Sequence, residues 1–198
     1  MGRRYLNIVL LTEGESDQWF LLPLIDRQVE ALESDTTVGF DFGGTVPGAC
    51  FTVSQRERVV AEVESLLKEM DLVIIHHDHN EQGKIDAVRS GLTDPASAAR
   101  VIGIVPVRET EAWMLADPDA LPQAPAAVVR ETVRSPRDVH KLADPKKTLA
   151  QAFGPRHRPE YDFDRLGQRV SLTVLRQVHA YARWVDDLRA AMERSHFL

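Results

Sequence analysis

The sequence predicts an α/β protein with a mostly parallel sheet of about four strands flanked by helices, followed by a small C-terminal helical appendage. Apolar runs at residues 5–11, 72–75 and 101–107 are too short for buried helices and rich in Ile, Val and Leu, as expected for parallel strands covered on both faces. Segments with helical periodicity separate them, which is typical of a parallel α/β sheet. No strand-like run follows residue 117, so we expect residues 1–117 to form the main domain and residues 118–198 the appendage.

Composition limits the class of protein. A chain of 198 residues with 43% hydrophobic and 27% charged residues can bury one sizeable core. Cys50 is the single cysteine, which excludes an internal disulfide framework. We find no signal peptide and no apolar run near the roughly 20 residues that span a bilayer, so a cytoplasmic location is expected. The net charge of −6 argues against a general nucleic-acid-coating protein, although a nuclease with local cations is compatible with it.

The first apolar run ends in acids and a glycine. Glu13 follows the strand, Ser16 is a candidate N-cap, and Asp17 falls in the first turn of a helix expected to run to about residue 33. Ligands bind at the carboxyl edge of open α/β sheets, so Glu13 and Asp17 are placed to address one cation. Two simpler interpretations stay open: Glu13 as a solvated loop residue and Asp17 as a partner of the helix dipole.

The next elements carry less chemistry. Residues 38–42 are expected to form a short strand and residues 43–48 a loop, whose glycines lack the ending of a phosphate-binding loop. Residues 54–57 form a capping box that starts a helix with apolar periodicity through residue 67.

The run at 72–75 leads into a second polar group. Asp78 and Asn80 are two residues apart, so in an extended backbone they project to one side and can ligate one ion through oxygen. His76, His77 and His79 invite a zinc interpretation. Neighbouring strand residues face opposite ways and no second His/Cys cluster is present, so structural or supporting histidines are favoured, with His79 close enough for proton transfer.

The run at 101–107 leads into Glu109 and Glu111. In an extended turn the two glutamates face the same way, whereas in a helix they diverge by about 200° and only one meets a metal. Both could also simply favour a helix N-terminus.

Three acidic strand ends together favour a metal site. Parallel strands bring their carboxyl ends to one edge, where the acids repel one another unless cations neutralise them. Hard oxygen ligands suit Mg²⁺ or Mn²⁺. The candidate ligands are Glu13, Asp17, Asp78, Asn80, Glu109 and Glu111.

Prolines punctuate the appendage into short helical segments. Asp144-Pro145 is expected to start a helix carrying Lys146 and Lys147, and residues 172–192 a long amphipathic final helix. The local cations form either a solvated basic face or a rim that contacts phosphates. These cations are Lys146, Lys147, Arg156, His157 and Arg158.

These motifs together resemble the Toprim domain, the topoisomerase–primase fold. The strand followed by Glu13-Gly14-x-x-Asp17, and the later strand ending in Asp78-x-Asn80, are similar to its two metal-binding motifs. The segment from Pro106 to Asp117, then 144–147 and a long terminal helix, resembles uncharacterised Toprim-like proteins akin to the overcoming-lysogenization-defect nucleases, which are often associated with bacterial phage defence.

The resemblance implies a Rossmann-like fold and a Mg²⁺- or Mn²⁺-dependent nuclease acting on DNA or RNA. It assigns catalytic roles to Glu13, Asp78, Glu109 or Glu111, and Lys146 or Lys147. The second acid of the Asp-x-Asp motif is Asn80 here, a ligand without charge, which Glu81, Glu109 or Glu111 would have to compensate. The alternative is a weakly active or inactive regulatory or binding subunit that works with a separately encoded ATPase partner.

Overall fold

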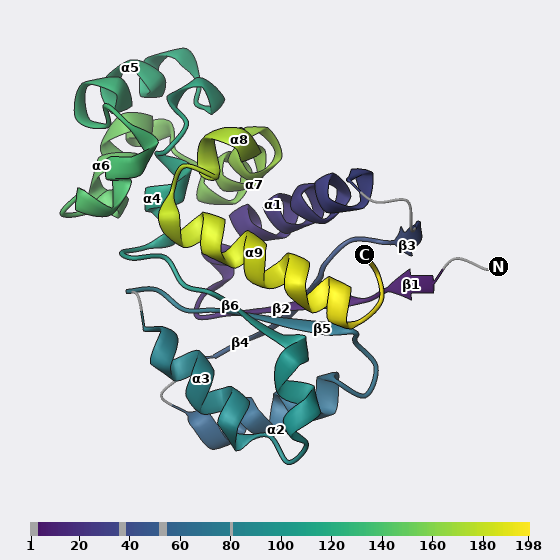
Figure 1. The fold of residues 1–198 in the computed structure, drawn as a ribbon. Coiled ribbons are helices and arrows are strands. Elements are labelled where there is room, and N and C mark those ends of the chain that lie inside the picture. The colour runs from purple at the N-terminus through teal and green to yellow at the C-terminus, as the bar shows by residue number, and fades with distance from the viewer. Residues whose placement is uncertain (1–3, 36–38, 52–54, 80) are drawn as a thin grey trace.

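The computed structural model describes residues 4–35, 39–51, 55–79 and 81–198. Its centre is a four-stranded, fully parallel sheet in the order β4-β2-β5-β6 (Figure 1). The strands are β2 (Ile8–Thr12), β4 (Val46–Cys50), β5 (Leu72–His76) and β6 (Val101–Ile104). Helices flank this sheet, so the predicted α/β fold, which is Rossmann-like, is confirmed.

The opening apolar run is two strands rather than one. β1 (Arg4–Leu6) pairs in parallel with β3 (Phe40–Phe42) in a separate two-stranded sheet, and the main sheet begins at Ile8. Asn7 separates them because its N–H donates to Asp71 Oδ2 and its carbonyl accepts the Asp71 N–H, both at 2.9 Å. The predicted strand at 38–42 is therefore present from Phe40, with Val38 outside the described residues.

The predicted loop at 43–48 was wrong, because its second half belongs to edge strand β4. Val46 pairs with Val9 of β2, and Gly48 lies so close to β2 that an added Cβ would be 3.0 Å from the Leu10 carbonyl oxygen. Four of the five residues of β4 are exposed. An edge strand exposed in this way has no apolar alternation from which it could be predicted.

Two helical layers cover the main sheet, and alternate strand residues point to each. Val9 and Leu11 pack with α2 (Arg56–Leu66) and α3 (Gln82–Gly91). Ile8 and Leu10 pack in the second core. That core includes α1 (Glu15–Ser34) and α9 (His179–Arg194), which Figure 1 shows on the opposite side of the sheet from α2 and α3.

Helix starts were predicted with mixed success. The capping residue of α1 is Gly14, without a side-chain hydrogen bond, rather than Ser16. Ser54 lies outside the described residues, and α2 begins at Arg56. Asp144 caps α6 (Pro145–Phe153) as expected, accepting the Lys147 N–H at 2.8 Å.

The C-terminal part is helical throughout its regular elements. After η1 (Pro95–Arg100) and β6 come α4, η2, α5, η3, α6, η4, α7, α8 and α9. The bounds not yet given are α4 (Thr110–Met114), η2 (Pro118–Ala120), α5 (Gln123–Thr132), η3 (Pro136–Lys141), η4 (Gly154–Arg156), α7 (Pro159–Arg169) and α8 (Leu172–Leu175). The predicted final helix is thus two helices, α8 and α9, because the chain becomes extended at Val178.

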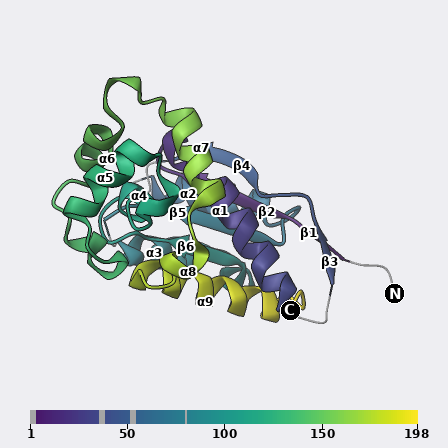
Figure 2. The ribbon, with the colours of Figure 1, turned by 90° about the horizontal axis from the view of Figure 1, so that it is seen from above.

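The C-terminal helices share a core with the sheet. α7 lies against α1 (Figure 2). Gly167 of α7 leaves no room for a Cβ beside the Phe20 carbonyl, and Trp184 of α9 is fully buried. α5 and α6 pack together at the end of the molecule nearest the carboxyl edge of the sheet (Figure 1). The boundary at residue 117 stays a prediction, and residues on both sides of it belong to one hydrophobic cluster. No helix in the described ranges is long and apolar enough to cross a membrane.

Candidate metal centre

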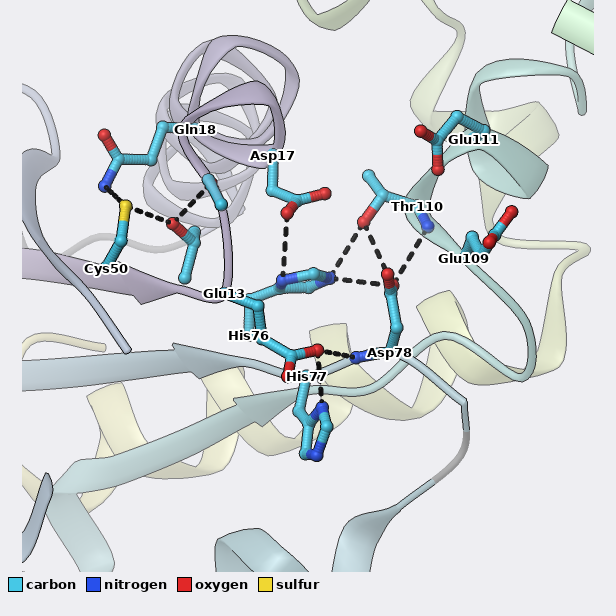
Figure 3. A network of polar contacts seen from close by, with 12 residues as sticks. Glu13, Asp17, Gln18, Cys50, His76, His77, Asp78, Glu109, Thr110 and Glu111 are labelled. Carbon is cyan, nitrogen blue, oxygen red and sulfur yellow. Dashed lines mark hydrogen bonds and ion pairs between the residues drawn. The ribbon is translucent and has the colours of Figure 1, made fainter. Parts of the chain in front are cut away.

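The acidic residues predicted from the strand ends gather at the carboxyl edge of the sheet (Figure 3). Glu13 follows β2, Asp78 follows β5, and Glu109 and Glu111 follow β6 around the start of α4. Asp17 reaches the same place from the first turn of α1. Parallel pairing of β2, β5 and β6 brings these ends together, as argued from the sequence.

Asp17, His76 and Asp78 form the tightest part of the site. One candidate ligand atom from each residue lies within 4.8 Å of the other two, close enough to hold one metal ion. His76 Nδ1 is 3.8 Å from Asp17 Oδ2, and His76 Nε2 is 3.1 Å from Asp78 Oδ1. His76 is completely buried, and the side chains of Asp17 and Asp78 are only 13% and 11% exposed.

His76 has one nitrogen available for a ligand. Its Nε2 lies 2.8 Å from Thr110 Oγ1 as well as 3.1 Å from Asp78, whereas buried Nδ1 has no hydrogen-bond partner among the described residues. If Nε2 carries the proton and donates it, the lone pair of Nδ1 faces Asp17. Metal-binding histidines commonly have this arrangement, with the second ring nitrogen donating to a carboxylate or other acceptor.

Thr110 orients Asp78. The Thr110 N–H donates to Asp78 Oδ1 at 3.1 Å, and its hydroxyl lies between His76 Nε2 and that oxygen. Because His76 and Thr110 both engage Oδ1, Oδ2 is the carboxylate oxygen of Asp78 left for a ligand. Thr110 is fully buried, so these contacts are shielded from water.

Glu13 is held beside this cluster by a different histidine. Its Oε2 is 2.7 Å from His77 Nδ1 and accepts the Asp78 N–H at 3.2 Å. His77 Nε2 in turn lies 2.9 Å from Glu81 Oε2. His77 therefore connects Glu13 to an acid outside the site, and Glu13 connects the end of β2 to that of β5.

Glu109 and Glu111 share one lysine. Lys146 Nζ lies 3.7 Å from Glu109 Oε1 and 4.0 Å from Glu111 Oε1, so both glutamates reach the same region. Glu109 has an extended backbone, and the helix begins only at Thr110. The carboxylates of Glu109 and Glu111 are therefore not separated as they would be if both residues lay in a regular helix. The Oε2 atom of each is buried without a hydrogen-bond partner among the described residues.

Burial and neighbouring charges shift the pKa values of the site residues, often in opposite directions. Burial raises the pKa of Glu111 to about 7 and also raises that of Asp17. Burial opposes charge on His76 and Asp78, but their mutual hydrogen bond and attraction prevail, so the pKa of His76 is raised and that of Asp78 lowered. The pKa of Lys146 is raised because the surrounding carboxylates outweigh the cost of its burial.

Some predicted site residues lie elsewhere or cannot be placed. Asn80 lies outside the described residues. Lys147 is exposed on α6, without an ion pair among the described residues. His157 is occupied structurally, since it pairs with Asp162 at 2.8 Å and stacks on Phe153.

Sequence reasoning missed His76 as a ligand candidate and Thr110 altogether. His76 was treated as a strand residue, but it ends β5 facing the α1 side, where Asp17 meets it. A signal was available for His76, because it is two residues before Asp78 and extended residues at that spacing share a face. No comparable signal marked Thr110.

Fold and site together define an α/β protein with a buried carboxylate–histidine cluster that could hold a metal ion. The family model of a domain of unknown function, DUF4276, matches residues 12–189, so the chain belongs to that family. No curated protein and no solved structure matches the chain.

Proposed function

We propose that this protein is a Toprim-like, metal-dependent phosphodiester hydrolase, a nuclease acting on DNA or RNA. The observation that supports it most directly is the buried cluster of Asp17, His76 and Asp78, in which the Nδ1 atom of His76 lacks a hydrogen-bond partner among the described residues. Such a donor set, with further carboxylates beside it, fits a divalent cation.

The donor set refines the choice of metal. Two carboxylates alone suit Mg²⁺, but an imidazole nitrogen favours a softer cation, so Mn²⁺ is preferred over Mg²⁺ at this cluster. Asp17, His76 and Asp78 would hold the ion, with Glu13 and Glu111 as further candidate ligands. A cation held there would polarise the phosphate and lower the pKa of the attacking water.

The protein's own groups account for the remaining chemistry. Water attacks phosphorus as its proton passes to a carboxylate, for which Glu13 is the proposed acceptor, and the P–O ester bond to the leaving oxygen breaks. Where Glu111 does not bind the ion, its carboxyl, whose pKa is raised to about 7 by burial in the metal-free protein, can return a proton to that oxygen. Lys146 would neutralise charge that develops on the phosphate oxygens.

The experiment is incubation of the purified protein with single- and double-stranded DNA and RNA, in Mn²⁺, in Mg²⁺ and in chelator. We expect cleavage that requires metal and falls at least about 100-fold in Glu13→Gln and Asp78→Asn. Asp187→Asn, a carboxylate exposed on α9, is the control with the same charge change. Cleavage that persists in chelator and in both site variants would overturn the proposal.

A second candidate function is a regulatory or binding subunit that acts through a separately encoded ATPase. It is favoured by the position of His76, whose raised pKa allows the imidazolium to neutralise Asp17 and Asp78 without metal. Thermal denaturation separates the two functions, since a hydrolase of this design should be stabilised by millimolar Mn²⁺ and the subunit should not. A cytoplasmic location and a role in phage defence are parts of the proposal that rest on sequence alone.

A further inference from the structure

A pocket of about 590 Å³ adjoins the metal cluster. Of its nine lining residues three are lysine or arginine, and two, Glu109 and Asp144, are acidic. It is lined by His79, Arg108, Lys146 and Lys147, together with Glu109 and the 143–145 segment at the start of α6. Its volume is within the range of about 300–1,000 Å³ typical of small-ligand sites. Glu109 and Lys146 belong to both the pocket and the acidic site, so the two are contiguous.

Two of the cations that line this pocket have no acidic partner among the described residues. Lys146 faces Glu109 and Glu111, but neither Arg108 nor Lys147 has an ion pair in the part of the chain that the structure describes. Arg108 and Lys147 therefore bring unpaired positive charge to one pocket beside the acidic site.

Backbone hydrogen bonds hold the segments that carry these side chains beside the metal cluster. The His79 N–H donates to the Arg108 carbonyl at 2.7 Å, which joins the loop after β5 to the loop after β6. His79 adopts a left-handed conformation with φ of 63°, a strained backbone for a residue with a side chain. The cap formed by Asp144 fixes the backbone of Lys147 at the start of α6, and Lys147 also lines the pocket.

We propose that this pocket binds the phosphate next to the scissile one, so that the substrate is a polynucleotide strand rather than an isolated phosphate ester. The inference rests on the proposed hydrolase function and adds to it a binding site for the neighbouring phosphate of the strand. One phosphate meets the metal cluster and Lys146, while the neighbouring phosphate and its nucleoside occupy the pocket against Arg108 and Lys147. The phosphate backbone is the source of most non-specific affinity for nucleic acid, which suits a pocket lined by Arg108, Lys146 and Lys147.

The first test measures binding without chemistry. Fluorescence anisotropy of labelled 12-nucleotide single-stranded DNA and RNA is followed in chelator across a salt series, for wild type, Arg108→Ala, Lys147→Ala and Lys68→Ala. Lys68 is an exposed lysine just beyond α2, so its loss is the matched control. We expect Kd to rise about tenfold in each pocket variant, and the slope of log K against log salt to become shallower by about 0.7. Arg108→Lys, which keeps the charge, should restore most of the affinity.

The second test compares two substrates in Mn²⁺. Bis(p-nitrophenyl) phosphate has a single phosphate and cannot fill both sites, whereas the oligonucleotide can. The ratio of kcat/KM for the oligonucleotide to kcat/KM for the small ester should fall at least about tenfold in Arg108→Ala and Lys147→Ala, and should stay at the wild-type value in Lys68→Ala.

The outcomes separate the two proposals. If both pocket variants match Lys68→Ala in affinity, salt slope and substrate ratio, the pocket is not a phosphate subsite and this inference is wrong. If wild type hydrolyses neither substrate, the hydrolase proposal fails, while the binding measurement still decides whether the pocket holds a strand.

Discussion

Replacing Glu111 by glutamine is expected to stabilise the metal-free protein above neutral pH. The Glu111 side chain is only 6% exposed, its Oε2 has no hydrogen-bond partner among the described residues, and burial raises its pKa from 4.5 to about 7. At about 1.4 kcal/mol per pH unit, this difference means that ionised Glu111 costs the folded state about 3 kcal/mol.

The sign of the pH dependence follows from the raised pKa. Below pH 4.5 the carboxyl is protonated in both the folded and the unfolded protein, so it contributes no difference. Between pH 4.5 and about 7 the folded state keeps a proton that the unfolded state releases, and stability falls as pH rises. The glutamine variant lacks this loss, so its advantage should grow through that window and level off above it.

The assay is thermal denaturation in chelator from pH 4 to pH 9. For a chain of this size about 1 kcal/mol corresponds to about 2–4 °C, so Glu111→Gln should melt about 6–12 °C above wild type at pH 8 and close to it at pH 4. Glu131→Gln on the exposed surface of α5 is the control and should show no such divergence.

Two results would refute this reasoning. A Glu111→Gln variant less stable than wild type at pH 8 would mean that attraction to Lys146 outweighs burial. A difference that does not change with pH would mean that Glu111 does not titrate in this window. If Glu111 is a metal ligand, saturating Mn²⁺ should reverse the order of the two melting temperatures. Only the wild-type protein then has the Glu111 carboxylate to bind the ion.

Three further predictions concern metal linkage and packing. Mn²⁺ at 100 times its Kd contributes about 2.7 kcal/mol and should raise the melting temperature of wild type by about 5–11 °C. Asp78→Asn should lose most of that rise, and an equal rise in the variant would show that Asp78 does not bind the metal. Tyr181→Phe removes the 2.7 Å hydrogen bond to buried Gln28 and should cost about 1–3 kcal/mol in denaturant unfolding, whereas an unchanged midpoint would show that the bond contributes nothing. Gly167→Ala places a Cβ against the Phe20 carbonyl between α7 and α1, so the free energy of unfolding measured in urea should fall by at least about 1 kcal/mol. A variant as stable as wild type would contradict the close approach of the two helices.

Periodicity in the sequence was sufficient to predict a strand or helix where the contacts that define it lie within its own segment. The buried strands β5 and β6 were predicted from short, continuously apolar runs. α1 and α2 were predicted from helical stripes, and α6 from its capping residue Asp144. The break at Asn7 and the edge strand β4 were not predicted. The first depends on hydrogen bonds to Asp71, 64 residues away, and the second is exposed and lacks an apolar pattern.

The sequence by itself determined that Glu13, Asp78, Glu109 and Glu111 meet at one edge, because parallel strands bring their carboxyl ends together whatever the details of packing. Only the tertiary structure decided the contacts and the environment of these side chains. The ring orientation of His76 depends on Thr110, which follows another strand. The pKa of Glu111 depends on burial by the surrounding elements, and Lys146, which lies near Glu111, belongs to α6. Periodicity along one segment does not encode contacts between distant segments, and these contacts set the charge and the available ligand atoms of the site.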